Sequence, residues 1–395
     1  MNSSVRKNVL EHLARMLDEE RNAILEANRM DVAACPTEDD VIVDRLKVDD
    51  KKIDAMIAAV RSVIAAPDPV GKILSSHTRK DGLRIENRAV PFGTILIIYE
   101  ARPDVSIEAA AIALKAGNKI LLKGGKEARN TNLCLVKLWR RALKVSGAEI
   151  DTIQYLDISR EETQSLIRGE YEKFDLVIPR GGEALINFVL QNSTAPVIVS
   201  GRGNNFLYID SEADLEMAVR IAVNGKQRLS VCNALDKILI NDNLPDLKTK
   251  TSRLIAALRE HGIEVIGDEE IVEIDPSVLP IPDEDIWYEE FLSAKIVIGI
   301  VTSTEEAIET INEYSGGHSA AIVTSNMATA DRFLDEVDCA AVYHNASTRF
   351  TDGGQLGLGA EIAISTQKLH FRGPLGAEHL LTNKWFVYGD GQIRD

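Results

Sequence analysis

Aromatic side chains and long apolar runs are both scarce in this chain of 395 residues. Phe, Trp and Tyr make up 5% of the residues although 45% are hydrophobic, a composition typical of an ordinary α/β enzyme with an aliphatic core. No apolar stretch approaches the roughly 20 residues that a membrane-spanning helix needs, and the charged, amphipathic N-terminus has no apolar signal core. The sequence therefore predicts a cytoplasmic protein with no membrane partner.

Positive charge and closely spaced cysteines are lacking as well. A formal net charge of −16 argues against nucleic acid as a partner, because binding a phosphate backbone needs an excess of Lys and Arg. The four cysteines, Cys35, Cys134, Cys232 and Cys339, lie far apart without CxxC spacing, which disfavours a zinc site and a disulfide framework. We expect no metal ion. A small anionic substrate stays compatible with the acidic chain, since it experiences only its local pocket.

What the chain does have is a repeated alternation of strand and helix. After predicted helices at 4–30 and 51–65, apolar strands are expected at 94–99, 119–123, 152–156, 175–178 and 196–199, and again at 237–240, 264–266, 295–301 and 321–323. Such alternation implies parallel sheets covered by helices on both faces. The length is too great for one ordinary core, so we predict two doubly wound α/β domains with an intimate interface and a cleft.

Two segments fall outside this alternation. Residues 82–97 alternate and then become apolar, which predicts a hairpin that leads into a buried strand. The apolar run KWFVY at 384–388 predicts a terminal strand that docks on another part of the protein.

Cys232, in the segment QRLSVCNA (227–234), is the best candidate for a nucleophile. A thiol reacts as its thiolate, and free cysteine titrates near about 8.5. Arg228 and a helix that we expect to begin at residue 232 would each lower that value. The alternative is a buried structural cysteine, which is also our default interpretation of the other three.

Three further segments combine glycine and polar residues after predicted strands. The turns KGGK (123–126) and PRGG (179–182) could bring backbone N–H groups to a phosphate, although plain strand-to-helix turns are the alternative. The run NASTRFTDGG (345–354) follows an apolar strand at 340–343, where ligand-binding loops gather in parallel sheets; a solvated loop is the alternative. His318 could act as a general acid or make an ordinary structural hydrogen bond.

Together these segments resemble one family, the gamma-glutamyl phosphate reductases, also called glutamate-5-semialdehyde dehydrogenases. The likeness is carried by YEARPDV (99–105), LLKGGKEARNTN (121–132), VIPRGGEALI (177–186), APVIV (195–199), QRLSVCNA (227–234), INEYSGGHSAAIVT (311–324) and NASTRFTDGGQLGLGAE (345–361). It extends from the first helix through APDPVGKI (66–73) to NKW (383–385) and so covers nearly the whole chain.

The resemblance implies the fold of the aldehyde dehydrogenase superfamily: two doubly wound α/β domains plus a β-hairpin and C-terminal oligomerisation flap. A dinucleotide-binding domain would span 1–229 and a catalytic domain with the nucleophilic cysteine 230–364. The hairpin near 80–95 would join the C-terminal arm 365–395 in the flap, which implies a homo-oligomer.

The resemblance also implies a reaction, the NADPH-dependent reduction of L-glutamyl 5-phosphate to L-glutamate 5-semialdehyde, the second step of proline biosynthesis from glutamate. The Cys232 thiolate would displace phosphate to form a thioester, and its backbone N–H would be one oxyanion donor. Lys123 would reach the adenosine ribose, Lys126 would suit a 2′-phosphate, and Glu290 would hold the nicotinamide ribose. The full set of implied cofactor-binding residues is Lys123, Gly124, Gly125, Lys126, Arg180, Gly181, Gly182 and Glu290. The substrate-binding candidates are Arg102, Asn345, Ser347, Thr348 and Arg349.

The chain departs from the pattern at several positions. Ala101 replaces an asparagine that supplies an oxyanion donor in the wider superfamily, and 200–206 lacks the glutamate base of aldehyde-oxidising members. Loss of that base would protect a thioester from water. Asn205-Phe206 replaces the Cys-His usual in the family, and further departures from the family pattern occur at Leu229, Thr310 and Ala320.

Other functions stay open at this point. The chain could be another acylating or oxidising aldehyde dehydrogenase, acting with coenzyme A or water. It could also be a catalytically silent scaffold for glutamate 5-kinase, the enzyme of the preceding step and a possible transient partner of an active reductase as well.

Overall fold

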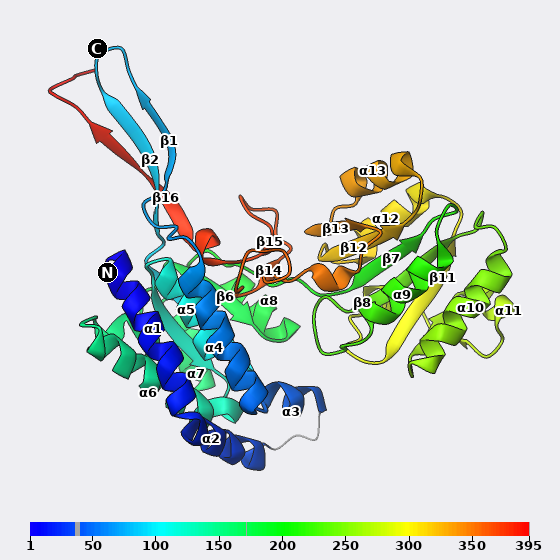
Figure 1. Cartoon of the computed structure of the whole chain (residues 1–395), viewed down its shortest axis with the longest axis horizontal. Helices are drawn as coiled ribbons and strands as arrows, with labels where there is room; N and C mark the ends of the chain where they lie inside the picture. Colours follow the sequence, from blue (N-terminus) through cyan, green and yellow to red (C-terminus); the bar gives the residue numbers. More distant parts are fainter. Residues whose placement is uncertain (36–39, 171, 395) are drawn as a thin grey trace. The chain divides into compact units, whose positions relative to one another are not determined.

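The computed structural model describes residues 1–35, 40–170 and 172–394 and divides the chain into two compact units (Figure 1). Unit 1 comprises Met1–Ser200, Gly357–Ala363 and Leu375–Asp395, and unit 2 comprises Gly201–Leu356 and Ile364–Pro374. This division groups 201–229 with the second unit, whereas the predicted dinucleotide-binding domain extends to residue 229. Within the described ranges, no helix is both long and apolar enough to span a membrane.

Unit 1 contains a four-stranded parallel sheet in the order β5-β4-β3-β6. Its strands are β3 (Thr94–Tyr99), β4 (Lys119–Gly124), β5 (Ile153–Tyr155) and β6 (Leu176–Arg180). Its helices are α1 (Ser3–Glu19), α2 (Arg21–Ala34), α3 (Asp40–Leu46), α4 (Asp50–Ala65), α5 (Val105–Lys115), α6 (Arg129–Val145), α7 (Arg160–Ile167) and α8 (Glu183–Asn192). The chain passes from β3 to β4 on one side and returns to β6 on the other. The carboxyl ends of β3 and β6 therefore form the switch point where ligands bind in such sheets.

The helices of unit 1 follow from the spacing of their apolar residues. On α1 the side chains of Val9, Leu10, Leu13 and Leu17 share one face and are fully buried, and Asn2 caps the helix by accepting a hydrogen bond from the Val5 N–H. The α5 helix is apolar nearly all round and buried along its length, as expected for a helix inside a core.

Unit 2 contains a seven-stranded parallel sheet in the order β10-β9-β11-β8-β7-β12-β13. Its strands are β7 (Asn205–Ile209), β8 (Leu235–Asn241), β9 (Glu264–Gly267), β10 (Leu279–Pro280), β11 (Lys295–Val301), β12 (Ser319–Val323) and β13 (Ala341–His344), and a separate pair is formed by β14 (Ile364–Ser365) and β15 (Gly373–Pro374). Its helices are α9 (Leu215–Gly225), α10 (Leu247–Glu260), α11 (Glu269–Ile274), α12 (Thr304–Tyr314) and α13 (Met327–Glu336).

The central strands of unit 2 are buried on both faces. Leu207 and Ile209 pack into one apolar cluster with residues of α9, α10 and α11, while Phe206 and Tyr208 pack into a second cluster with residues of α12 and α13. Strands covered on both faces read as continuous apolar runs rather than alternating ones. The doubly wound α/β architecture expected from the sequence is confirmed.

A hairpin leads into a buried strand as predicted, but its first strand lies before the predicted range of 82–97. β2 (Arg84–Pro91) pairs antiparallel with β1 (Ile73–Thr78), whereas the following strand β3 enters the parallel sheet. The C-terminal strand β16 (Leu381–Tyr388) docks on the other side of β2, so β1, β2 and β16 form a three-stranded ribbon (Figure 1). Docking of the apolar tail is therefore confirmed.

Two other sequence-based assignments need correction. The expected strand at 196–199 is reduced to a single bridge between Val177 and Val197. Strand β7 was not expected from the sequence, because glycine and asparagine precede it and obscure its apolar run.

Candidate active site

Cys232 lies in a turn that leads directly into β8, and its side chain is partly buried. The turn is closed by a hydrogen bond of 3.1 Å from the Ala234 N–H to the Val231 carbonyl. No helix begins at residue 232, so the expected contribution of a helix N-terminus to thiolate stability is wrong. The thiol instead sits at the amino edge of the second sheet.

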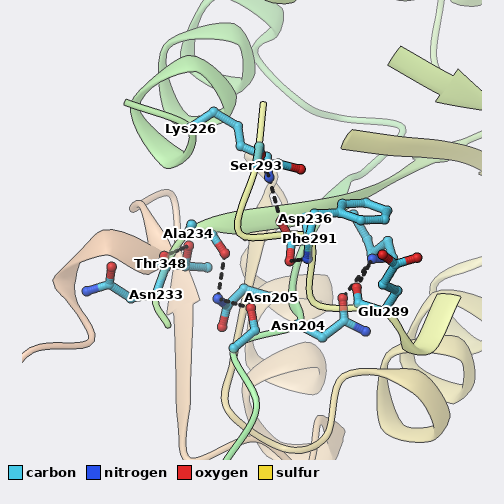
Figure 2. A network of polar contacts seen from close by, with 12 residues as sticks. Asn204, Asn205, Lys226, Asn233, Ala234, Asp236, Glu289, Phe291, Ser293 and Thr348 are labelled. Atoms are coloured by element: carbon cyan, nitrogen blue, oxygen red, sulfur yellow. Dashed lines mark hydrogen bonds and ion pairs between the residues drawn. The ribbon is translucent and has the colours of Figure 1, made fainter. Parts of the chain in front are cut away.

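The backbone of Cys232 is fixed by the segment that precedes β7. A Cβ on Gly203 would lie 1.8 Å from the Cys232 carbonyl oxygen, so only glycine allows this approach. The Asn205 amide nitrogen donates to the carbonyls of Cys232 at 2.7 Å and Gly203 at 2.8 Å. It also donates to the Ala234 carbonyl at 2.6 Å (Figure 2). Asn205 is fully buried, so its contacts with the main chain around Cys232 are shielded from water.

Arg349 supplies positive charge close to the thiol. Burial lowers the pKa of Arg349, the charge of Arg228 lowers it further, and the groups of Cys232 and Asp352 act in the opposite direction. Its Nη1 atom is buried and has no hydrogen-bond partner in the structure. A buried guanidinium nitrogen without an acceptor is costly, and an anionic substrate group could provide one.

The other predicted substrate-binding residues of the 345–349 run are engaged with the backbone. The Thr348 hydroxyl donates to the Asn233 carbonyl at 3.1 Å, and the Ser347 hydroxyl accepts from the Arg349 N–H at 3.3 Å. The Asn345 amide bonds both backbone groups of Thr324, and Asn345 itself adopts a positive φ of 54°. These three residues shape the loop that carries Arg349, and their predicted contacts with substrate stay untested.

His318, Cys134 and Cys339 are poorly suited to chemistry at neutral pH. Burial lowers the pKa of His318 to about 4, and its Nδ1 lies 3.0 Å from Asn205 Oδ1 and 2.6 Å from Ser319 Oγ. A neutral, fully buried imidazole fits the structural alternative. Burial also raises the pKa of the Cys134 thiol and that of Cys339 to about 11.

Glu290 lies between the short helix at Glu284–Tyr288 and strand β11, and it is partly buried. Its charge raises the pKa of both Lys226 and Lys237, although burial is the largest influence and lowers both, that of Lys237 to about 7. Two buried lysines thus face the segment that carries Glu290. Sequence reasoning missed both of them, because a lysine in a strand is ordinarily expected to reach solvent.

The first predicted cofactor turn in unit 1 is tightly packed. A Cβ on Gly124 would lie 2.3 Å from the Asn132 amide, and a Cβ on Gly125 would lie 1.9 Å from the Glu127 carboxylate. Lys123 is partly buried, with Nζ 2.7 Å from the Gly124 carbonyl, and burial lowers its pKa. Lys126 is exposed at the start of the turn's short helix.

The second predicted cofactor turn already holds an anionic oxygen. Gly182 precedes α8, and its backbone N–H donates at 3.0 Å to the Glu100 carboxylate. A Cβ on Gly181 would lie 2.6 Å from the same carboxylate. Because the carboxylate stands in for an anion at a helix N-terminus, this turn fits the diphosphate of a dinucleotide, which would have to displace Glu100.

Arg102 and Arg180 border a cluster of carboxylates that the sequence did not reveal. Burial and the neighbouring Asp104 raise the pKa of Glu108 to about 8, with smaller opposing effects of Arg180 and Arg102 and a further raising effect of Glu361. Asp104 Oδ1 is buried without a hydrogen-bond partner. The i, i+4 spacing of Asp104 and Glu108 after strand β3 is the signal that could have found the pair.

Among the described residues, no group of three or more His, Cys, Asp or Glu side chains is arranged to hold a metal ion.

Comparison with known proteins yields consistent matches. The aldehyde dehydrogenase family profile matches residues 1–270 and 250–359. A gamma-glutamyl phosphate reductase from Thermotoga maritima is 45% identical over 390 residues, which are 98% of this chain and 93% of that protein. The crystal structure of gamma-glutamyl phosphate reductase from the same organism superposes with a TM-score of 0.93 at 44% identity, covering 100% of this chain and 95% of the other. An acetylating aldehyde dehydrogenase from Geobacillus thermoglucosidasius shares the fold, with a TM-score of 0.71, 18% identity, and coverage of 100% and 94%.

The raised pKa of Glu108 predicts a stability that depends on pH. The Glu108 carboxyl loses its proton near pH 4.5 in the unfolded chain but only near pH 8 in the folded one. Ionisation in the unfolded chain therefore lowers the free energy of unfolding progressively as pH rises between these values. Glu108→Gln removes the ionisation. We expect its melting temperature to exceed that of the unchanged protein by a margin that grows from pH 5 to pH 8 and then levels off. Thermal denaturation across pH 5–9 tests this, and a margin independent of pH contradicts it.

Proposed function

Because the chain belongs to the gamma-glutamyl phosphate reductase family of aldehyde dehydrogenases, we propose that this oxidoreductase reduces L-glutamyl 5-phosphate to L-glutamate 5-semialdehyde and releases phosphate. This is the second step of proline biosynthesis from glutamate. The observation that carries the proposal is a partly buried thiol, Cys232, whose backbone is clamped by Asn205 and whose neighbour Arg349 has an unpartnered buried nitrogen.

Cys232 acts as the nucleophile in this proposal. Its thiolate forms a bond to the acyl carbon of the substrate while the carbon–oxygen bond to phosphate breaks, which leaves a thioester and inorganic phosphate. Arg349 stabilises the thiolate and the anion that develops at the acyl group. The thiolate is regenerated when the product aldehyde leaves.

Arg349 and Arg102 are the proposed ligands of the substrate's phosphate and α-carboxylate, because a guanidinium binds both groups bidentately. Ser347, Thr348 and Asn345 also stay proposed substrate ligands. Their hydrogen bonds to backbone groups make them, first of all, positioning residues for Arg349.

The cofactor that we propose is NADPH, which supplies the hydride that reduces the thioester. Its proposed binding residues are Lys123, Gly124, Gly125, Lys126, Arg180, Gly181, Gly182 and Glu290. The exposed Lys126 is free to approach a 2′-phosphate, which favours NADPH over NADH. Glu290 is proposed to hold the nicotinamide ribose.

The segment 200–206 carries no carboxylate, so no general base is proposed to direct water to the thioester. This absence favours a phosphate-releasing reductase over an aldehyde oxidase. The alternative of a silent scaffold is disfavoured by the intact thiol and its partners, whereas transient contact with glutamate 5-kinase, the cytoplasmic location and the domain boundaries at 229 and 364 stay predictions.

Replacement of the nucleophile tests the chemistry. We expect Cys232→Ser to lower both NADPH-dependent reduction and phosphate-dependent oxidation of the semialdehyde by at least about a thousandfold, since a neutral hydroxyl is a poor nucleophile. NADP⁺ reduction is measured with the semialdehyde, with and without inorganic phosphate. Cys134→Ser, another partly buried cysteine, is the matched control and keeps activity. Turnover that survives in Cys232→Ser, or acid formation that needs no phosphate, contradicts the proposal.

Glu100 competes with the proposed diphosphate for the start of α8. We expect Glu100→Ala to tighten NADPH binding severalfold, because the Gly182 N–H loses its internal acceptor and a negative charge is removed. Fluorescence titration measures the Kd. Glu161→Ala, which removes an exposed carboxylate from the first turn of α7, leaves it unchanged. Weaker binding in Glu100→Ala would show that this carboxylate does not occupy the cofactor's place.

The β1–β2–β16 ribbon is the proposed oligomerisation flap. Trp385 and Val387 share one face of β16 and are each 55% exposed, and Ile73 and Leu74 of β1 are similarly exposed. We expect Trp385→Asp to shift the molar mass in light scattering towards smaller species, because a charge opposes burial of this face. Thr382→Asp, on the opposite face of β16, is the control. An unchanged mass in both variants contradicts the assignment.

A further inference from the structure

Lys237 lies on strand β8 and is fully buried. It connects this strand to the segment that carries Glu290. Its ammonium nitrogen lies 2.9 Å from Asn204 Oδ1, 2.7 Å from the Glu289 carbonyl oxygen and 4.0 Å from the centroid of the Phe291 ring. One of the contacts reaches the segment before β7, and the other two reach the segment that carries Glu290. The lysine therefore fixes the backbone next to Glu290 relative to the segment before β7.

The adjacent residue Asp236 binds the same segment at Phe291. Its carboxylate accepts from the Phe291 N–H at 3.0 Å and from Lys226 Nζ at 2.5 Å, and Lys226 also donates to the Ser293 carbonyl at 3.3 Å (Figure 2). Consecutive side chains of a regular strand point to opposite faces. Here a register shift between β7 and β8 falls at this point, and such a bulge lets Asp236 and Lys237 reach the same segment.

The segment is held in a conformation that it would not adopt by itself. Leu292, with a φ of 48°, occupies the left-handed region without being glycine. Such residues persist only where their surroundings determine them, and they cluster at functional sites. The contacts of Lys226, Asp236 and Lys237 with residues 289, 291 and 293 flank Leu292 on both sides.

The neighbouring residues Asn204 and Asn205 bind two different segments of the backbone. Asn205 binds the Cys232 carbonyl, as described above, whereas Asn204 accepts from Lys237 and donates to the carbonyls of Trp287 at 2.6 Å and Tyr314 at 2.8 Å. The backbone of the nucleophile and that of the Glu290 segment are thereby anchored to two consecutive residues.

We propose that Lys237 and Asn204 are positioning residues for the cofactor, which hold Glu290 at a fixed place relative to Cys232 through the backbone of Glu289. This inference rests on the proposed function, because it assigns Glu290 to the nicotinamide ribose. Hydride transfer tolerates little misplacement, and an error of about 1 Å can lower a rate about a hundredfold. A rigid link between the two residues serves that requirement.

Lys237→Met tests the link, because methionine fills a similar volume and donates no hydrogen bond. We expect the Kd for NADPH, measured by fluorescence titration, to rise about tenfold, as it does in Glu290→Gln. The double variant is expected to bind no more weakly than the weaker single variant, because both changes remove the same interaction. The rate at which iodoacetamide alkylates Cys232 stays unchanged in Lys237→Met.

Two further variants separate positioning from general stability. Asn241→Ala removes a buried amide at the far end of the same strand, where it bonds the Tyr208 hydroxyl, and we expect it to lower the melting temperature without changing the Kd. Asn205→Ala gives the converse of Lys237→Met, an altered alkylation rate with an unchanged Kd. If Lys237→Met does not fold, Asn204→Asp replaces it, since the carboxylate still accepts from Lys237 but no longer donates to Trp287 and Tyr314.

The outcomes distinguish the inference from the proposed function. If the unchanged protein binds neither NADPH nor NADH, the proposed function fails and the inference with it. If it binds NADPH and Lys237→Met or Asn204→Asp binds equally well, or if the effects of Lys237→Met and Glu290→Gln add, the inference is overturned and the proposed function stands.

Discussion

The structure of the candidate site depends on one constraint, the hydrogen bonds that the Asn205 amide donates to the backbone around Cys232. One amide nitrogen lies within 2.8 Å of three carbonyl oxygens, those of Gly203, Cys232 and Ala234. The absence of a side chain at Gly203 lets the two segments approach closely enough for this contact. Because Asn205 begins β7 and Cys232 precedes β8, the position of the thiol is set by the pairing of two buried strands and not by a flexible loop.

The sequence predicted much of the fold, because its signals were local. Strands β3, β4, β8 and β11 are apolar runs bounded by glycine or charge, and their order along the chain implies parallel sheets. The pairing of β2 with β16 was not predictable in the same way. It joins residues about 300 positions apart, such as Arg88 and Lys384, and alternation within one segment carries no information on its partner. Strand β7 was missed because its pairing, together with burial on both faces, defines it better than its composition does.

Site residues whose chemistry depends on residue type could be predicted from the sequence. Those whose chemistry depends on burial could not. Cys232 and the glycine turns stand out in the sequence. Lys226, Lys237 and Glu108 do not, since an isolated lysine or glutamate is ordinarily solvated. Only the fold reveals that the two lysines are withdrawn from water and that Glu108 is partly buried. The departures from the family pattern become intelligible in the same light. Phe206 and Ala320 are directly paired on neighbouring strands and belong to one apolar cluster, so an aromatic ring and a small residue together occupy positions where the family carries a histidine and an acidic group.

The buried charges of Lys226, Asp236 and Lys237 need a physical explanation, because removing two lysines and an aspartate from water is costly. Replacement of a buried ion pair by apolar side chains is often neutral or stabilising, and Trp287, Phe291 and Ile286 already provide an apolar setting for the segment. An all-apolar contact, however, would not specify one backbone position, since apolar surfaces pack in several registers. Hydrogen bonds from Lys237 to the Glu289 carbonyl and from Phe291 to Asp236 permit only one. The charges are therefore best understood as the means by which a segment with a left-handed residue, Leu292, is held in a single conformation.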